Sequence, residues 1–213
     1  MVKNLRITTE CPINQEKDNF KTVIIDKASY NKLNDEFDPT RDLISYSAKY
    51  DENKDILIKI KVQKYMRNAF ESDSSIVVLL DFIRDSGSYI LPFHIRGATD
   101  HWWEVAYSIK NEKLLMQNSE DTPHLKDQKI IELLQINEKD SEIKLKIDLK
   151  KLKQFGWSEN FPLYVQILTH KGEIITDSFN DPKPYENANF LVGAMPINKF
   201  LKYNSKCQEI HPH

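Results

Sequence analysis

One stretch of the chain, residues 75–109, constrains the fold more than any other, because it combines a long apolar run with two turn signals. Ser75–Phe82 is a nearly continuous run of Ile, Val and Leu, which is typical of a strand covered on both faces. Arg84–Ser88 and Gly97–Asp100 have the composition of turns. Trp102–Ile109 alternates with a period of two residues. We therefore expect three consecutive strands, with one face of the last strand in the core.

The rest of the chain adds further short strands and very little helix. Asp42–Tyr50 and Ile56–Val62 alternate around a polar turn and predict a β-hairpin, as do Phe161–Leu168 and Glu173–Phe179. A short helical turn is expected at Lys150–Phe155. Other strands are expected at Lys21–Asp26, Leu114–Gln117 and Glu142–Leu149, and Ile130–Ile136 is expected to be a strand or a helical turn. About nine or ten strands predict an all-β fold, an antiparallel two-sheet β-sandwich of the jelly-roll or immunoglobulin-like kind. A closed barrel is the alternative.

The 213 residues suit one large β domain with short extensions. Residues 1–21 are polar and irregular, and we expect an N-terminal extension there. Residues 22–180 carry the strand pattern and form the predicted sandwich domain. Residues 181–213 contain four prolines and little periodicity, so we expect a C-terminal tail or a linker.

Charge is spread evenly along the chain, with 30 basic and 32 acidic residues and a net charge of −2. A nucleic-acid surface would show clustered Lys and Arg, so no nucleic-acid partner is expected. No apolar run is long enough to span a membrane, and the N-terminus lacks the apolar segment of a signal peptide. Cys11 and Cys207 either pair as a terminal clasp or remain two free thiols.

Motifs of the common catalytic classes are absent, and we expect the chain not to be an enzyme. One loop is rich in oxygen ligands: Asp35–Asp42 contains several carboxylates before a predicted strand. Such a loop can supply part of a calcium shell, and Asp38 and Asp42 are its candidate ligands. The alternative is a solvated loop in which the aspartates cap turns.

Tryptophans are the most informative candidates for a binding site. Trp102 and Trp103 are adjacent on a predicted strand, so their side chains face opposite sides of the sheet. Trp157 follows the turn at Gly156. An exposed indole suits stacking on the C–H face of a sugar ring, and Arg96 is a candidate partner for sugar hydroxyls. The alternative for each tryptophan is a place in the core.

The order of short motifs resembles the β-sandwich superfamily of family 9 carbohydrate-binding modules and DOMON-like domains. The closest likeness is to the C-terminal module of glucodextranase-type enzymes. It rests on Asp38–Leu43 (DPTRDL), Asp73–Asp81, Trp103–Ala106 (WEVA), Gly156-Trp157 and Val165–Gly172, over about residues 22–180. The chain departs from the pattern in the first motif, where an arginine stands in place of the family's glycine.

This resemblance implies a non-catalytic accessory module of a larger bacterial protein, a carbohydrate-active enzyme or a cell-surface protein. The implied partners are an oligosaccharide or polysaccharide and neighbouring domains, and the implied location is extracellular or on the cell surface. A structural calcium ion near Asp38 and Asp42 is also implied. Two alternatives remain open: a structural or docking sandwich without a ligand, and a haem-binding DOMON-like domain that uses Met66 and a histidine.

Overall fold

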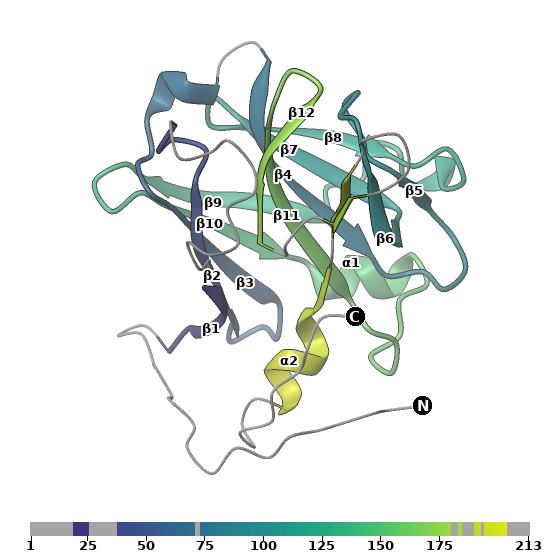
Figure 1. Cartoon of the computed structure of the whole chain (residues 1–213). Helices are drawn as coiled ribbons and strands as arrows, with labels where there is room; N and C mark the ends of the chain where they lie inside the picture. Colours follow the sequence, from purple (N-terminus) through teal and green to yellow (C-terminus); the bar gives the residue numbers. More distant parts are fainter. Residues whose placement is uncertain are drawn as a thin grey trace.

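Two antiparallel sheets face each other in the computed structural model, which describes residues 19–25, 38–70, 73–179, 183–184, 190–192 and 194–203 (Figure 1). The predicted all-β sandwich is confirmed. The first sheet has the strand order β1 (Lys21–Ile25), β2 (Leu43–Tyr50), β3 (Ile56–Val62), β10 (Glu142–Ile147) and β9 (Ile131–Asn137). The second has the order β12 (Ile174–Ser178), β11 (Tyr164–Lys171), β4 (Ser74–Asp81), β7 (Val105–Lys110) and β8 (Lys113–Asn118).

A third, smaller sheet that the sequence did not predict lies against the second. Its order is β13 (Lys183–Pro184), β14 (Phe190–Val192), β6 (Ala98–Trp103) and β5 (Ser88–Ile90). The helices are short: α1 (Leu149–Gln154), α2 (Ile197–Tyr203) and the 3-10 turns η2 (Arg67–Phe70) and η3 (Pro123–Leu125). The predicted helical turn at Lys150–Phe155 is therefore confirmed as α1, and the Asp148 side chain caps its first turn by accepting a hydrogen bond from the Lys151 N–H at 3.0 Å.

The principal core lies between the two large sheets. Alternate residues of β3 and β10, such as Ile58, Ile60 and Leu145, are completely buried there. They pack in one cluster with Val78 and Leu80 of β4. The period-two patterns that predicted the strands therefore also identify the faces that are buried.

Strand β4 is buried on both faces, as its continuous apolar run predicted. The side chains of Val77 and Leu79 point away from the principal core and form a second apolar cluster. Leu91, Ile95 and Trp103, from the β5–β6 region, cover that cluster. The third sheet therefore covers the outer face of the second sheet.

The expected turn at Gly97–Asp100 and the expected single strand Trp102–Ile109 are both wrong. Ala98 begins β6, and the chain then leaves the third sheet at Glu104 and enters the second sheet as β7. The Glu104 carboxylate turns inward, where its Oε2 accepts a hydrogen bond from the Phe82 N–H at 2.7 Å. The alternation of the sequence continues through Glu104 without a break, so the pattern hid a switch between sheets.

Part of the expected tail, residues 181–213, packs against the sandwich. Met195 and Pro196 form β15, which pairs with β11. Ile197 and Phe200 of the following helix α2 enter the principal core, and the helix lies beside β1 and β2 (Figure 1). Residues 1–18 of the expected N-terminal extension (residues 1–21) lie outside the described residues. Cys11 and Cys207 lie outside them as well.

Candidate functional site

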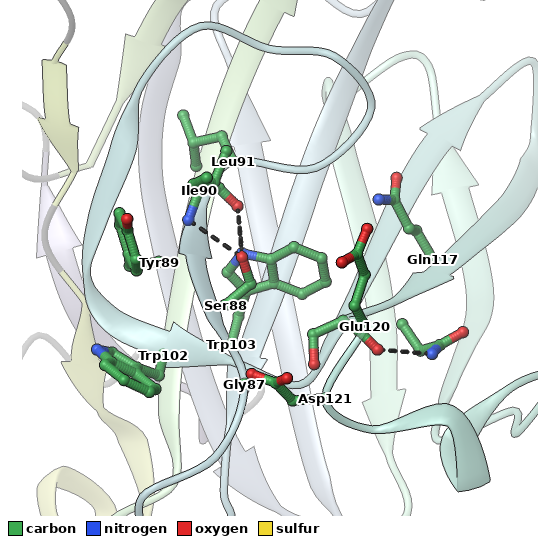
Figure 2. Close-up of a pocket in the computed structure, with 12 residues that line it drawn as sticks. Gly87, Ser88, Tyr89, Ile90, Leu91, Trp102, Trp103, Gln117, Glu120 and Asp121 are labelled. Carbon is green, nitrogen blue, oxygen red and sulfur yellow. Dashed lines mark hydrogen bonds between the residues drawn. The ribbon is translucent and has the colours of Figure 1, made fainter.

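Two large aromatic side chains are exposed on the β5–β6 ribbon, which we define as Ser88–Ile90 and Ala98–Trp103. Trp102 exposes 50% of its surface and Tyr89 exposes 47%. Their ring centroids lie 6.3 Å apart at an interplanar angle of 45°. Figure 2 shows these two rings on one side of the ribbon, with the Trp103 indole on the other. We call Tyr89 and Trp102 the aromatic pair.

Burial of Trp103 sets the direction of Trp102, because neighbouring residues of a strand face opposite sides. Trp103 is 3% exposed, and its indole N–H donates a hydrogen bond to the Ile90 carbonyl at 2.8 Å. The turn before β5 also approaches β6 closely at Gly87, where φ is +105°. A Cβ atom at this glycine would lie only 2.6 Å from the Trp103 carbonyl oxygen. The ribbon is therefore held in a geometry that leaves Trp102 facing outward.

Beside Trp102 lies a hollow of about 400 Å³, which we call the His101 hollow. Its other walls come from the end of β4, the following loop, β6, and the segment that leads into β11. The His101 ring stacks on Tyr164 with centroids 3.8 Å apart and an angle of 19°. Its lining residues are Asp81, Ile83, Arg84, Asp85, Ser86, Asp100, His101, Trp102, Phe161 and Tyr164.

Two carboxylates lie at the two nitrogens of the His101 ring. Asp81 Oδ2 is 3.5 Å from Nδ1, and Asp100 Oδ1 is 3.9 Å from Nε2. Burial, together with the negative charge of Asp100, raises the pKa of Asp81 to about 7. A backbone hydrogen bond from Trp102 opposes this shift. Asp81 is therefore a carboxyl group that changes protonation state near neutral pH.

Glu104 lies behind this hollow and is completely buried. Burial raises its pKa to about 9, although hydrogen bonds from the backbone, with that of Phe82 foremost, oppose the shift. The neighbouring Asp81 adds to it. Glu104 is therefore protonated at neutral pH. Its Oε1 atom has no hydrogen-bond partner among the described residues.

A second hollow, of about 360 Å³, lies over Trp103, and we call it the Trp103 hollow. Amide and acidic side chains from the end of β8 and the following loop form one wall, as Figure 2 shows for Gln117, Glu120 and Asp121. The Gln117 Oε1 atom accepts a hydrogen bond from the Phe93 N–H at 2.9 Å. Trp102 borders this hollow as well as the His101 hollow.

The other sequence-based candidates for sugar binding lie elsewhere. Trp157 is 4% exposed and packs in the principal core after α1. Arg96 is exposed, but it pairs with Glu173 at the β11–β12 turn, where Nε and Oε2 are 2.5 Å apart. Of the four residues proposed for this role, only Trp102 therefore offers an exposed aromatic face. Tyr89, Asp81 and His101 were not singled out in the sequence, because nothing local to each marks its proximity to Trp102.

Asp38, the first calcium candidate, is engaged with its own loop. Its carboxylate accepts hydrogen bonds from the Thr40 N–H at 3.0 Å and from the Thr40 hydroxyl, and it forms an ion pair with Arg41 at 2.7 Å. Asp42 directly precedes β2, and Asp35 lies outside the described residues. The described residues contain no group of three or more His, Cys, Asp or Glu side chains suited to a metal ion. The assignment of Asp38 and Asp42 as calcium ligands stays a prediction from the sequence.

Met66 bears on the haem-binding alternative, and a serine–histidine pair bears on catalysis. Met66, the candidate haem ligand, exposes 47% of its surface just before η2. Ser75 and His170 form a buried pair, with Oγ and Nε2 2.7 Å apart, and the other ring nitrogen lies 2.9 Å from the Gly172 carbonyl. Both residues are almost completely buried, which suits a structural hydrogen bond between β4 and β11 rather than an accessible nucleophile.

Among the helices within the described ranges, none is long and apolar enough to cross a membrane.

Comparison with known proteins adds no assignment. No model of a known protein family matches the chain, and no curated protein matches it. The candidate site therefore stands on its own geometry: an exposed aromatic pair between two hollows lined with carboxyl and amide groups.

Proposed function

We propose that the chain is a non-catalytic carbohydrate-binding module, and that Trp102 is the platform on which a sugar ring stacks. The observation that carries this proposal is the half-exposed Trp102 indole, paired with Tyr89 and bordered on each side by a polar hollow. The resemblance to accessory modules of larger extracellular bacterial proteins supports the same function.

The chemistry of the site suits a sugar. An indole face provides a flat apolar surface for the C–H groups of a pyranose ring. Carboxylate oxygens accept hydrogen bonds from hydroxyl groups, and amide side chains both donate and accept them. Asp81 and Asp100 provide such groups in the His101 hollow, and Asn118 and Glu120 provide them in the Trp103 hollow, both of which Trp102 borders.

Isothermal titration calorimetry against a panel of soluble oligosaccharides tests this proposal, with wild type compared with Trp102→Ala. For the best ligand of the panel we expect at least a roughly tenfold weaker affinity in the variant, because a stacked aromatic ring is lost. Trp102→Phe, which keeps an aromatic ring, is the matched control and should retain most of the affinity. If no oligosaccharide binds to wild type, or if Trp102→Ala binds as well as wild type, the proposal is wrong.

A docking domain is the second candidate, favoured by exposed apolar residues on two edge strands. Leu115 of β8 and Leu134 of β9 expose 50% and 45% of their surfaces. Such residues suit contact with a neighbouring domain. The two functions are separated by Trp102→Ala, which leaves a docking surface on β8 and β9 unchanged.

A further inference from the structure

The surface around Trp102 is acidic on both sides. The two hollows are lined by five carboxyl groups, those of Asp81, Asp85, Asp100, Glu120 and Asp121. Their basic residues are Arg84 and His101, both in the His101 hollow. Arg84 contacts the adjacent Asp85, with Nε and Oδ2 3.4 Å apart, so that this exposed arginine faces a carboxylate of its own loop.

Aromatic rings line the same surface. Trp102, Phe161 and Tyr164 all border the His101 hollow, and Tyr89 lies next to Trp102. The face of an aromatic ring attracts a cation, most strongly when the ring is an indole. Carboxylates and aromatic faces around one hollow therefore share a preference for positive charge, whereas either group alone would also accept a neutral hydroxyl or C–H group.

We infer that the ligand of this site is a sugar chain that carries ammonium groups, such as an oligomer of 2-amino-2-deoxyglucose, with one ammonium group in the His101 hollow beside Asp81 and Asp100. This inference rests on the proposed carbohydrate-binding function and names the class of sugar. The ammonium group donates charge-assisted hydrogen bonds to the carboxylates, which are stronger than those of a neutral hydroxyl group. The rest of the sugar ring lies against the indole of Trp102.

The protonation chemistry of the hollow agrees with a cationic ligand. A carboxyl group with a pKa near 7, such as that of Asp81, is readily ionised when a positive charge approaches. Asp100, His101 and Arg84 face this carboxyl from the lining of the hollow, Tyr164 faces it from β11, and Glu104 lies behind it. An N-acetyl group or a hydroxyl group at the same position of the sugar carries no charge, so its hydrogen bonds to Asp81 and Asp100 are weaker than those of an ammonium group.

The test is calorimetric titration of the full chain with three tetrasaccharides of the same β-1,4 linkage, near neutral pH, where Asp81 and the amine are both partly ionised. Their sugar units are glucose, N-acetylglucosamine and glucosamine, which differ only in the hydroxyl, acetamido or ammonium group at carbon 2. We expect the glucosamine tetramer to bind at least about tenfold more tightly than either of the others, and its affinity to fall as salt is added.

Two variants locate the effect. Asp100→Asn and, separately, Asp81→Asn each remove one carboxylate without changing its size, and each should lower the ratio of glucosamine-tetramer affinity to glucose-tetramer affinity several-fold. Glu52→Gln, on the exposed β2–β3 turn of the first sheet, is the matched control and should leave the preference intact. Preservation of the full preference in both aspartate variants would overturn the inference.

The remaining outcomes separate this inference from the proposed function. Equal or tighter binding of the glucose or N-acetylglucosamine tetramer would refute the ammonium inference but would leave a carbohydrate-binding module. Failure of every tetrasaccharide and of the wider oligosaccharide panel would refute both. Binding of a lysine tetrapeptide as tightly as the glucosamine tetramer would show that the site recognises charge without sugar and would also overturn the inference.

Discussion

Trp157 and Trp102 are the same residue type in two contrasting regions. Trp157 follows α1, donates its backbone N–H to the Leu152 carbonyl at 3.0 Å, and is 4% exposed in the principal core. Trp102 lies on the β5–β6 ribbon, outside both large sheets, and is 50% exposed. Trp157 lies in the loop after α1 and Trp102 lies near the end of β6, and local sequence at neither place shows whether the indole is buried. What separates them is whether a second layer covers the side chain.

The ribbon shows how a third layer produces an exposed site. Its inner face is occupied by Trp103, which covers the second apolar cluster with Leu91 and Ile95. Nothing among the described residues covers the outer face at Trp102 and Tyr89 to the same degree. We therefore expect substitutions at Trp157 to affect stability, and substitutions at Trp102 to affect binding.

The largest expected effect is on the free energy of unfolding of Trp157→Ala. Loss of a buried indole leaves a cavity and should destabilise the fold by about 3–5 kcal/mol. Trp102→Ala removes a half-exposed ring and should change stability by no more than about 0.5–1 kcal/mol. Urea unfolding followed by circular dichroism measures both. Equal losses for the two variants would mean that the ribbon is as much a part of the core as Trp157.

A second effect concerns Glu104, whose raised pKa makes stability depend on pH. The folded state binds the proton more tightly than the unfolded state, so the stability contribution is complete below a pH of about 4.5 and is lost as the pH rises towards 9. Glu104→Gln keeps the shape without the ionisation, and near pH 8 it should be more stable than wild type by several kcal/mol, because wild type loses up to about 1.4 kcal/mol for each pH unit above 4.5. Near pH 4 the two proteins should be alike. Stability curves that run parallel for the two proteins from pH 4 to 8 would contradict the raised pKa of Glu104.

A smaller effect is expected at Gly87, which holds the turn against β6. Both the positive φ and the 2.6 Å approach of a Cβ atom to the Trp103 carbonyl oxygen oppose any side chain. Gly87→Ala should lower the melting temperature and weaken ligand binding, at a cost of about 1–3 kcal/mol. Gly172→Ala is the control: φ is also positive, at +56°, but no atom lies within 4 Å of the new Cβ. An equal loss in the two variants would show that strain in φ alone matters.

Local periodicity predicted the parts of the fold that depend on neighbouring residues. The β2–β3 hairpin, the doubly covered β4 and the β11–β12 hairpin all follow from alternation or from an apolar run. The switch at Glu104 was missed because a single inward-turned carboxyl does not break a hydrophobic pattern. The docking of β15 and α2 was missed because it depends on contacts with β11, β1 and β2, far away along the chain.

The candidate site, like the fold, could be predicted from the sequence only in part. Opposite faces for Trp102 and Trp103 follow from strand geometry alone, and the structure confirms them. No pattern in the sequence identifies which of the two indoles is exposed, since that depends on the second apolar cluster. Asp81, His101 and Tyr164 meet only because β4 ends, and β11 begins, beside β6. No spacing within the sequence brings these three residues together.

Tryptophan fluorescence during a glycan titration tests the central claim, that Trp102 is the sugar platform, most directly. The glucosamine tetramer and the wider oligosaccharide panel are titrated into wild type and into Trp102→Phe, in which the two buried indoles are the remaining tryptophans. We predict a saturable change in emission in wild type and almost none in Trp102→Phe, although calorimetry still detects binding to that variant. An unchanged signal in wild type across the panel, or the same change in both proteins, would contradict the claim.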